Sequence, residues 1–439
     1  MSLTDKVIKN TFYHFLSQFL GFLSPLILIP IIISKIGPVD FGIYVIVLGF
    51  IGSFGLLDMS LSSSFIRFIS EHYNLGERES LAQVINTGFL FYFFYSVIVA
   101  LLAYFFGNNI ISLINIPPEK VQLAFTSFYI ALIIFSLTNS FSIFNSIIIS
   151  LQKIYLGAIA SSIITSLYLT AVLLLMFLGF GLISLLLASL TSTIVSIIVT
   201  LFIVKRILPE IQISPKSFSK DRFKEMFKFG IQMQISRLAT FTSEKYDEFL
   251  LGVFSILNNV TFFNLGNKVA SYGKLIPAQL IIQIAPVAAE LKAKEETEKL
   301  KQLFIDSTKY LNTAAIPIFI YLFTFADILI FAWIGNGYEL SAQILRILVV
   351  GFLINFMLSV PGNSIIPNTG KPKYQMIEGL IYLSINVILS YILIKNYNVI
   401  GAAIGSTIST LIASLYILRT SNDLFKTKAF QILRQTILH

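Results

Sequence analysis

Apolar stretches long enough to cross a bilayer recur along the whole chain, and short polar breaks separate them. A spanning helix needs about 20 mostly apolar residues, and about twelve stretches reach that length. The sequence therefore predicts an all-α, polytopic membrane protein of about twelve transmembrane helices. The expected helices lie near residues 10–34, 41–70, 81–106, 119–150, 155–178, 181–204, 228–254, 262–290, 304–334, 339–367, 374–394 and 399–418.

The longest charged break divides these helices into two groups of six. Lys153 and Lys373 precede corresponding helices of the two halves, and Gly181 and Gly401 repeat at the same spacing. An even number of helices in each half predicts parallel repeats related by an axis along the membrane normal. We expect a six-helix bundle at 1–206, a cytoplasmic linker at 207–227, a second six-helix bundle at 228–421 and a cytoplasmic amphipathic tail at 422–439.

Composition and charge support a membrane location. Hydrophobic residues make up 56% of the chain and charged residues 12%, against about 25% charged in soluble domains. The net charge of +9 comes from 31 basic against 22 acidic residues, and most of the basic residues fall in alternate breaks. The other breaks contain only Lys35, Lys120 and Lys395. This asymmetry predicts that both termini lie in the cytoplasm of a bacterial inner-membrane protein, with no nucleic-acid partner.

Polar residues at membrane depth are concentrated in the stretches 228–254 and 262–290. In a helix, Arg237, Glu244, Asp247 and Glu248 lie within an arc of roughly 100°. Asn264, Asn267, Lys268, Ser271 and Lys274 share a face of the next helix in the same way. Each ionisable group at this depth costs about 2.5–3.5 kcal/mol, which favours a functional role.

These two polar helix faces predict a water-filled cavity through which an anionic substrate passes. Ion pairs that only hold the two helices together would also explain them. The candidate substrate contacts are Arg237, Asn267, Lys268, Lys274 and Lys245, the last of which points off the arc. The candidate ion-coupling residues are Asp247, Glu244, Glu248 and Asp58, which lies in the second helix. For Arg346 and Asp327 we favour a structural role.

Several chemistries are not supported by the sequence. It has no phosphate-binding P-loop, and three scattered histidines without cysteine do not form a metal site. The short outer loops offer no catalytic segment. We expect a protein that is not an enzyme and needs no cofactor.

Three motifs resemble those of polysaccharide-export flippases of the MOP superfamily. FGLLDMSLSSSFIRFISEHYNLGE at Phe54–Glu77 resembles the second-helix signature of that family, with Ser60 in place of its usual glycine. IGPVDFGIY at Ile36–Tyr44 resembles its first outer turn, and YDEFLLGVFS at Tyr246–Ser255 its seventh helix. The match gives Asp247 the acidic position of the family and Lys268 a commonly basic one.

The resemblance implies a flippase of the Wzx type, which moves undecaprenyl-pyrophosphate-linked oligosaccharide repeat units across the inner membrane by alternating access. Its partners would be the lipid-linked oligosaccharide, the bilayer, H⁺ or Na⁺, and polysaccharide assembly proteins. The alternatives are a MATE-type multidrug/cation antiporter, which favours a more acidic cavity, and a membrane polysaccharide polymerase.

Overall fold

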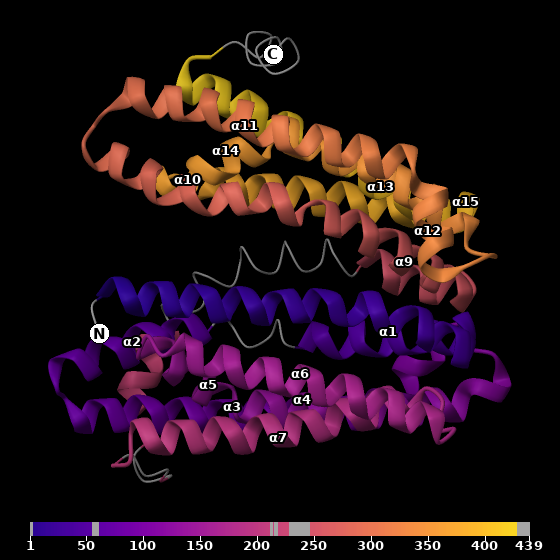
Figure 1. Cartoon of the computed structure of the whole chain (residues 1–439), viewed down its shortest axis with the longest axis horizontal. Helices are drawn as coiled ribbons and strands as arrows, with labels where there is room; N and C mark the ends of the chain where they lie inside the picture. Colours follow the sequence, from indigo (N-terminus) through magenta and orange to yellow (C-terminus); the bar gives the residue numbers. More distant parts are fainter. Residues whose placement is uncertain (1–2, 55–60, 211–213, 215–217, 228–245, 428–439) are drawn as a thin grey trace. The chain divides into compact units, whose positions relative to one another are not determined.

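The computed structural model describes residues 3–54, 61–210, 214, 218–227 and 246–427 (Figure 1). Every regular element in these ranges is a helix, which confirms the predicted all-α class. The chain divides into two compact units, Met1–Arg237 and Leu238–His439. The finer boundaries expected from the sequence stay predictions, and most of the expected tail lies outside the described residues.

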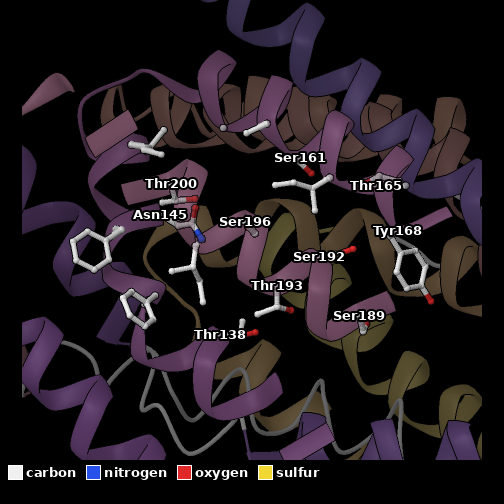
Figure 2. A pocket seen from close by; sticks show the side chains of 18 of the residues that line it. Thr138, Asn145, Ser161, Thr165, Tyr168, Ser189, Ser192, Thr193, Ser196 and Thr200 are labelled. Atoms are coloured by element: carbon white, nitrogen blue, oxygen red, sulfur yellow. The ribbon is translucent and has the colours of Figure 1, made fainter. Parts of the chain in front are cut away.

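The first unit is a bundle of long helices. In it α1 packs on α4 and α6, α4 packs on α3 and α7, and α6 packs on α7. Together α1, α4, α5, α6 and α7 line an open cavity of about 590 Å³ (Figure 2). Its elements are α1 (Leu3–Phe54), α2 (Leu61–Leu75), α3 (Arg78–Ser112), η2 (Pro118–Lys120), α4 (Val121–Ser140), α5 (Ser142–Ser150), α6 (Ile154–Phe177) and α7 (Ile183–Ile207), followed by helical residues 220–227.

The second unit is organised around α13, which contacts α9, α11, α12, α14 and α15. One end has an apolar core in which the rings of Phe304 and Phe425 stack with centroids 4.8 Å apart. Helical residues 246–254 precede α9 (Leu257–Gly273), α10 (Leu275–Ala293), α11 (Thr297–Thr324), α12 (Ala326–Ile334), α13 (Glu339–Leu358), α14 (Val360–Ile365), η4 (Pro367–Thr369) and α15 (Lys373–Phe425).

Two very long helices each contain a break that falls between two predicted spans. Gly37 interrupts α1 at φ 77°, and Asn398 interrupts α15 at φ 50°. Both conformations are left-handed, which glycine and asparagine tolerate best. The expected continuous helix 262–290 is instead two helices, α9 and α10, which meet at Lys274.

Among the described residues, seven helices are long and apolar enough to cross a membrane, or eight if the bent pair α11–α12 forms one span. This confirms a multi-pass membrane protein. The count of twelve stays a prediction, because breaks shorten several helices and much of the seventh expected span lies outside the described residues.

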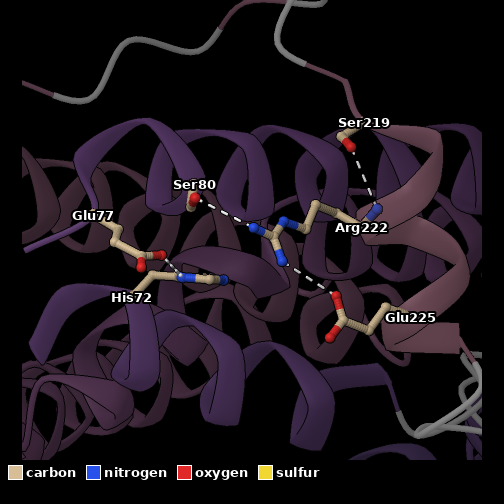
Figure 3. Close-up of polar contacts among 6 residues, drawn as sticks. All are labelled: His72, Glu77, Ser80, Ser219, Arg222 and Glu225. Atoms are coloured by element: carbon tan, nitrogen blue, oxygen red, sulfur yellow. Dashed lines mark hydrogen bonds and ion pairs between the residues drawn. The ribbon is translucent and has the colours of Figure 1, made fainter. Parts of the chain in front are cut away.

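Part of the predicted linker is tied to the first unit. Arg222 donates to Ser80 Oγ at 3.3 Å and pairs with Glu225 at 3.3 Å (Figure 3). Nearby, His72 Nδ1 lies 2.7 Å from Glu77 Oε2. Ser64 Oγ also donates to the carbonyl of Met226 at 2.9 Å. The end of the linker is therefore packed against α2 and α3.

The two halves of α15 are in close contact at Gly401. A Cβ atom there would overlap the backbone carbonyl of Leu393, which no side-chain rotation can relieve. We expect Gly401→Ala to lower the free energy of unfolding by about 2 kcal/mol or more, as measured by thermal unfolding in detergent. Gly21→Ala is the control, since nothing lies within 4 Å of its Cβ position. Equal stability of the two variants would contradict this packing.

Candidate functional site

The structure describes five of the nine predicted site residues, all in the second unit. Asp247 and Glu248 lie in helical residues 246–254, Asn267 and Lys268 lie in α9, and Lys274 directly follows α9. The other four, Arg237, Glu244, Lys245 and Asp58, lie outside the described residues.

Asp247 lies in a buried polar cluster with residues from both halves of α15. Its side chain is 2% exposed, and Ser406 Oγ donates a hydrogen bond to its Oδ2. Asn386 Nδ2 donates to Ser390 Oγ at 3.1 Å and to Ser406 Oγ at 3.2 Å. Asn386 and Ser390 are fully buried, and both also lie beside the carboxylate. We call Asp247, Asn386, Ser390 and Ser406 the Asp247 cluster.

The Asp247 cluster contains two buried oxygens that accept no hydrogen bond from the described residues. They are Oδ1 of Asp247 and Oδ1 of Asn386. Buried polar atoms are rarely left unsatisfied, because each costs about 1–3 kcal/mol. A carboxylate, an amide oxygen and two hydroxyls are also the ligand types that hard cations prefer. The cluster is therefore chemically suited to a small cation or a proton.

Glu248 points to a different neighbour from Asp247, because successive helical residues are about 100° apart. Its side chain is 3% exposed and accepts a hydrogen bond from Asn264 Nδ2 of α9 at 2.7 Å. This bond joins the predicted acidic face to the predicted polar face of α9. The helical segment 246–254 thus directs one carboxylate to α15 and the other to α9.

The two lysines of the polar α9 face, Lys268 and Lys274, are partly shielded from solvent. Asn267, Lys268 and Lys274 are all half-buried. Lys274 Nζ lies 4.0 Å from the ring centroid of Phe352 in α13, a favourable cation–π distance. Gly273 allows close packing on α11, since a Cβ there would lie 2.5 Å from Leu322 Cδ1.

Arg346 and Asp327 form an ion pair between α13 and α12. Arg346 Nε also donates to the carbonyl of Phe323 at 3.2 Å. These contacts join the bent α11–α12 pair to the central helix, as a structural role requires.

Two groups of polar residues were missed by the sequence reasoning. The partners of Asp247 on α15 are uncharged, and so are the hydroxyl-bearing residues around the first-unit cavity. The available signal was polar residues at helical spacing inside apolar stretches, as in Ser189, Ser192, Thr193 and Ser196. Among the described residues, no group of three or more His, Cys, Asp or Glu could hold a metal ion.

The polysaccharide biosynthesis protein family matches residues 7–292. This chain belongs to that family. Within the polysaccharide biosynthesis family the chain is 24% identical over 413 residues to a Shigella flexneri protein named "Putative O-antigen transporter". The alignment covers 93% of this chain and 96% of the relative. The family resemblance stated from the sequence motifs is thereby confirmed.

Solved transporter structures have the same fold as this member of the polysaccharide biosynthesis family. An inward-facing multidrug resistance MATE transporter of the MOP superfamily superposes with a TM-score of 0.77 at 15% identity, over 93% of this chain and 94% of that one. The lipid II flippase MurJ in an inward closed conformation gives 0.76 at 18% identity, over 98% and 90%. The family match and the name of the S. flexneri relative agree with the expectation that the chain is not an enzyme.

Proposed function

We propose that this chain is a flippase that carries undecaprenyl-pyrophosphate-linked oligosaccharide repeat units across the bacterial inner membrane, driven by an ion gradient. The observation that carries the proposal is that helical residues 246–254 contact both sites: Asp247 belongs to the Asp247 cluster, and the adjacent Glu248 accepts a hydrogen bond from Asn264 of α9, the helix that carries Lys268. The name of the S. flexneri relative supports the substrate class. Alternating access would expose the site first to the cytoplasm and then to the outer face.

The lysines of the polar α9 face give the substrate its anchor. A pyrophosphate is a compact anion, and lysine binds phosphate as a point charge. Lys268 and Lys274 lie two turns apart or less along α9, so one diphosphate can be close to both. Arg237, Asn267 and Lys245 complete the proposed substrate contacts on the basis of the sequence.

The Asp247 cluster supplies the coupling. When Na⁺ or H⁺ neutralises Asp247, the ligands on α15 and the helix carrying Asp247 are drawn together around one site. Because Asn386 and Ser390 lie on one side of the Asn398 break and Ser406 on the other, occupancy would bias the angle between the two halves of α15. Glu244, Glu248 and Asp58 are the other proposed coupling residues.

A MATE-type antiporter is the second candidate, favoured by the fold likeness to the multidrug transporter. It would bind an organic cation, which two half-buried lysines repel. The two functions therefore differ in the charge of the substrate and can be separated directly.

Deletion of the gene tests the proposal. We expect the complete lipid-linked repeat unit to accumulate on the cytoplasmic face, measured by its accessibility to a glycosidase in inside-out vesicles against right-side-out vesicles. Plasmid-borne wild-type chain should restore the outer-face pool. Normal translocation together with loss of ethidium efflux would establish the antiporter instead, and unpolymerised units on the outer face would indicate a polymerase.

A further inference from the structure

The described residues that line the cavity of the first unit are all uncharged. Many of them carry a hydroxyl group, and none of these described lining residues is Asp, Glu, Lys, Arg or His. The cavity volume of about 590 Å³ falls in the range of roughly 300–1,000 Å³ typical of small-molecule sites. Figure 2 shows the labelled polar side chains of the cavity wall: Thr138, Asn145, Ser161, Thr165, Tyr168, Ser189, Ser192, Thr193, Ser196 and Thr200.

The hydroxyls of α7 reach the cavity because of their spacing. Ser189, the adjacent pair Ser192 and Thr193, then Ser196 and Thr200 follow one another at helical spacing, which places all five within about 100° on one face of the helix. All five line the cavity. Helix α6 presents Ser161, Thr165 and Tyr168 at the same spacing. Two neighbouring helices thus direct hydroxyl groups into one space.

Hydroxyl groups of α6 that face away from the cavity form hydrogen bonds within their own helix. Ser162, Ser166 and Thr170 each donate a hydrogen bond of 3.0 Å to a carbonyl one turn earlier. These bonds satisfy a hydroxyl within its own helix, as is usual in apolar surroundings. None of these three residues lines the cavity.

Ser192 identifies the cavity as a place where a polar ligand is accommodated. Its side chain is 6% exposed, and its Oγ makes no hydrogen bond to the part of the chain that the structure describes. A hydroxyl both donates and accepts hydrogen bonds, so it can bind a sugar hydroxyl whether that group donates or accepts. Leaving such a group buried without a partner costs about 1–3 kcal/mol.

Aromatic rings supply the complementary apolar surface. Phe141, Phe144 and Tyr168 line the cavity, and the first two rings stack with centroids 6.0 Å apart. The C–H face of a pyranose packs on such a ring, while its hydroxyls point outward to polar partners. Few rings and many hydroxyls are the combination that an oligosaccharide requires.

We propose that this cavity binds uncharged sugar residues of the translocated oligosaccharide and does not bind its pyrophosphate. The inference rests on the proposed function and adds to it the part of the substrate that this cavity takes. Because its described lining includes no cation, the cavity cannot neutralise the negative charge of a pyrophosphate. Because that lining includes no carboxylate, it cannot neutralise the positive charge of an organic cation either. Neutral, hydroxyl-rich sugar is the substrate part that its chemistry fits.

Single cysteines introduced into the naturally cysteine-free chain test the proposal. Thr193→Cys and Thr165→Cys place a thiol on the cavity wall from two different helices. Ser166→Cys is the matched control, because Ser166 is exposed and lies outside the lining. The purified variants are labelled with N-ethylmaleimide, either alone, with lipid-linked oligosaccharide extracted from the deletion strain, or with undecaprenyl pyrophosphate that carries no sugar.

We expect the oligosaccharide to slow labelling of both cavity cysteines at least fivefold and to leave the control unchanged. Undecaprenyl pyrophosphate alone should protect neither. As a second readout, Thr193→Val combined with Ser196→Ala should reduce translocation about tenfold, the effect of two ordinary hydrogen bonds.

The contrary outcomes separate this inference from the proposed function. If radiolabelled oligosaccharide binds and is translocated but protects neither cavity cysteine, the sugar site is wrong and the flippase stands. If undecaprenyl pyrophosphate without sugar protects the cavity cysteines as well as the oligosaccharide does, the cavity binds the lipid carrier, and its assignment to sugar is overturned. If the oligosaccharide neither binds nor is translocated, both proposals fail.

Discussion

We expect Asp247→Asn to remove the dependence of translocation on an ion gradient and to lower its rate at least ~10-fold. The substitution keeps the size of the side chain and its ability to accept a hydrogen bond from Ser406, so the packing survives. It removes the one negative charge that the Asp247 cluster offers to a cation or a proton. Without that charge, the cluster no longer changes its occupancy when the gradient changes.

The measurement uses proteoliposomes loaded with lipid-linked oligosaccharide, with Na⁺ and H⁺ gradients imposed separately. Glu378→Gln is the matched control, because Glu378 is a half-buried carboxylate of α15 that accepts hydrogen bonds from Ser359 and Asn363. It lies outside the Asp247 cluster, and we expect its variant to respond to the gradient as the wild type does. A gradient response that survives in Asp247→Asn, or that disappears equally in both variants, would place the coupling elsewhere.

We expect Lys274→Ala to reduce translocation at least ~10-fold while the protein still inserts and folds. A hydrogen bond to a charged group contributes about 1.5–3 kcal/mol, and each 1.36 kcal/mol corresponds to a factor of ten. Lys274 is held near the end of α9 by the ring of Phe352, 4.0 Å from its ammonium nitrogen. A cation fixed in this way needs little further ordering when the pyrophosphate arrives.

Lys274→Met separates charge from packing, because methionine retains most of the apolar stem without the ammonium group. We expect it to be as impaired as the alanine variant in binding undecaprenyl pyrophosphate, measured with the purified protein. Lys294→Ala is the control, since Lys294 is exposed and already paired with Glu290 at 2.6 Å. Full activity of Lys274→Met would show that the stem matters rather than the charge, and would remove Lys274 from the proposed anchor.

The local elements of the fold could be predicted because they depend on local sequence. Long apolar stretches lead to helices in a bilayer, where every backbone polar group must be satisfied internally. The breaks of α1 at Gly37 and of α15 at Asn398 fall in the short polar intervals between expected helices. The division of the expected 262–290 helix at Lys274 was missed, although Pro277 was a local signal for it: proline has no backbone N–H to donate, and its ring clashes with the carbonyl four residues earlier.

The candidate site was only partly predictable for a similar reason. Asp247 and Glu248 could be singled out, because a carboxylate in an apolar helix is costly wherever it lies. Their partners could not, since Ser406 lies 159 positions along the chain from Asp247. Serine and asparagine also occur throughout the apolar helices in ordinary structural roles. Asn386, Ser390 and Ser406 differ from the other serines and asparagines only because the fold places them beside the carboxylate of Asp247.

By itself, the sequence determined the helical class, the membrane environment and the family, since these follow from hydrophobicity summed over long stretches and from motifs read in order. The tertiary structure decided which polar groups meet. It brought Asp247 to both halves of α15, joined Glu248 to α9, and turned the hydroxyls of α6 and α7 toward one cavity. The physical reason is that burial and hydrogen bonding depend on which helix faces pack together. Helical periodicity shows which residues share a face, but it does not show which other helix packs against that face.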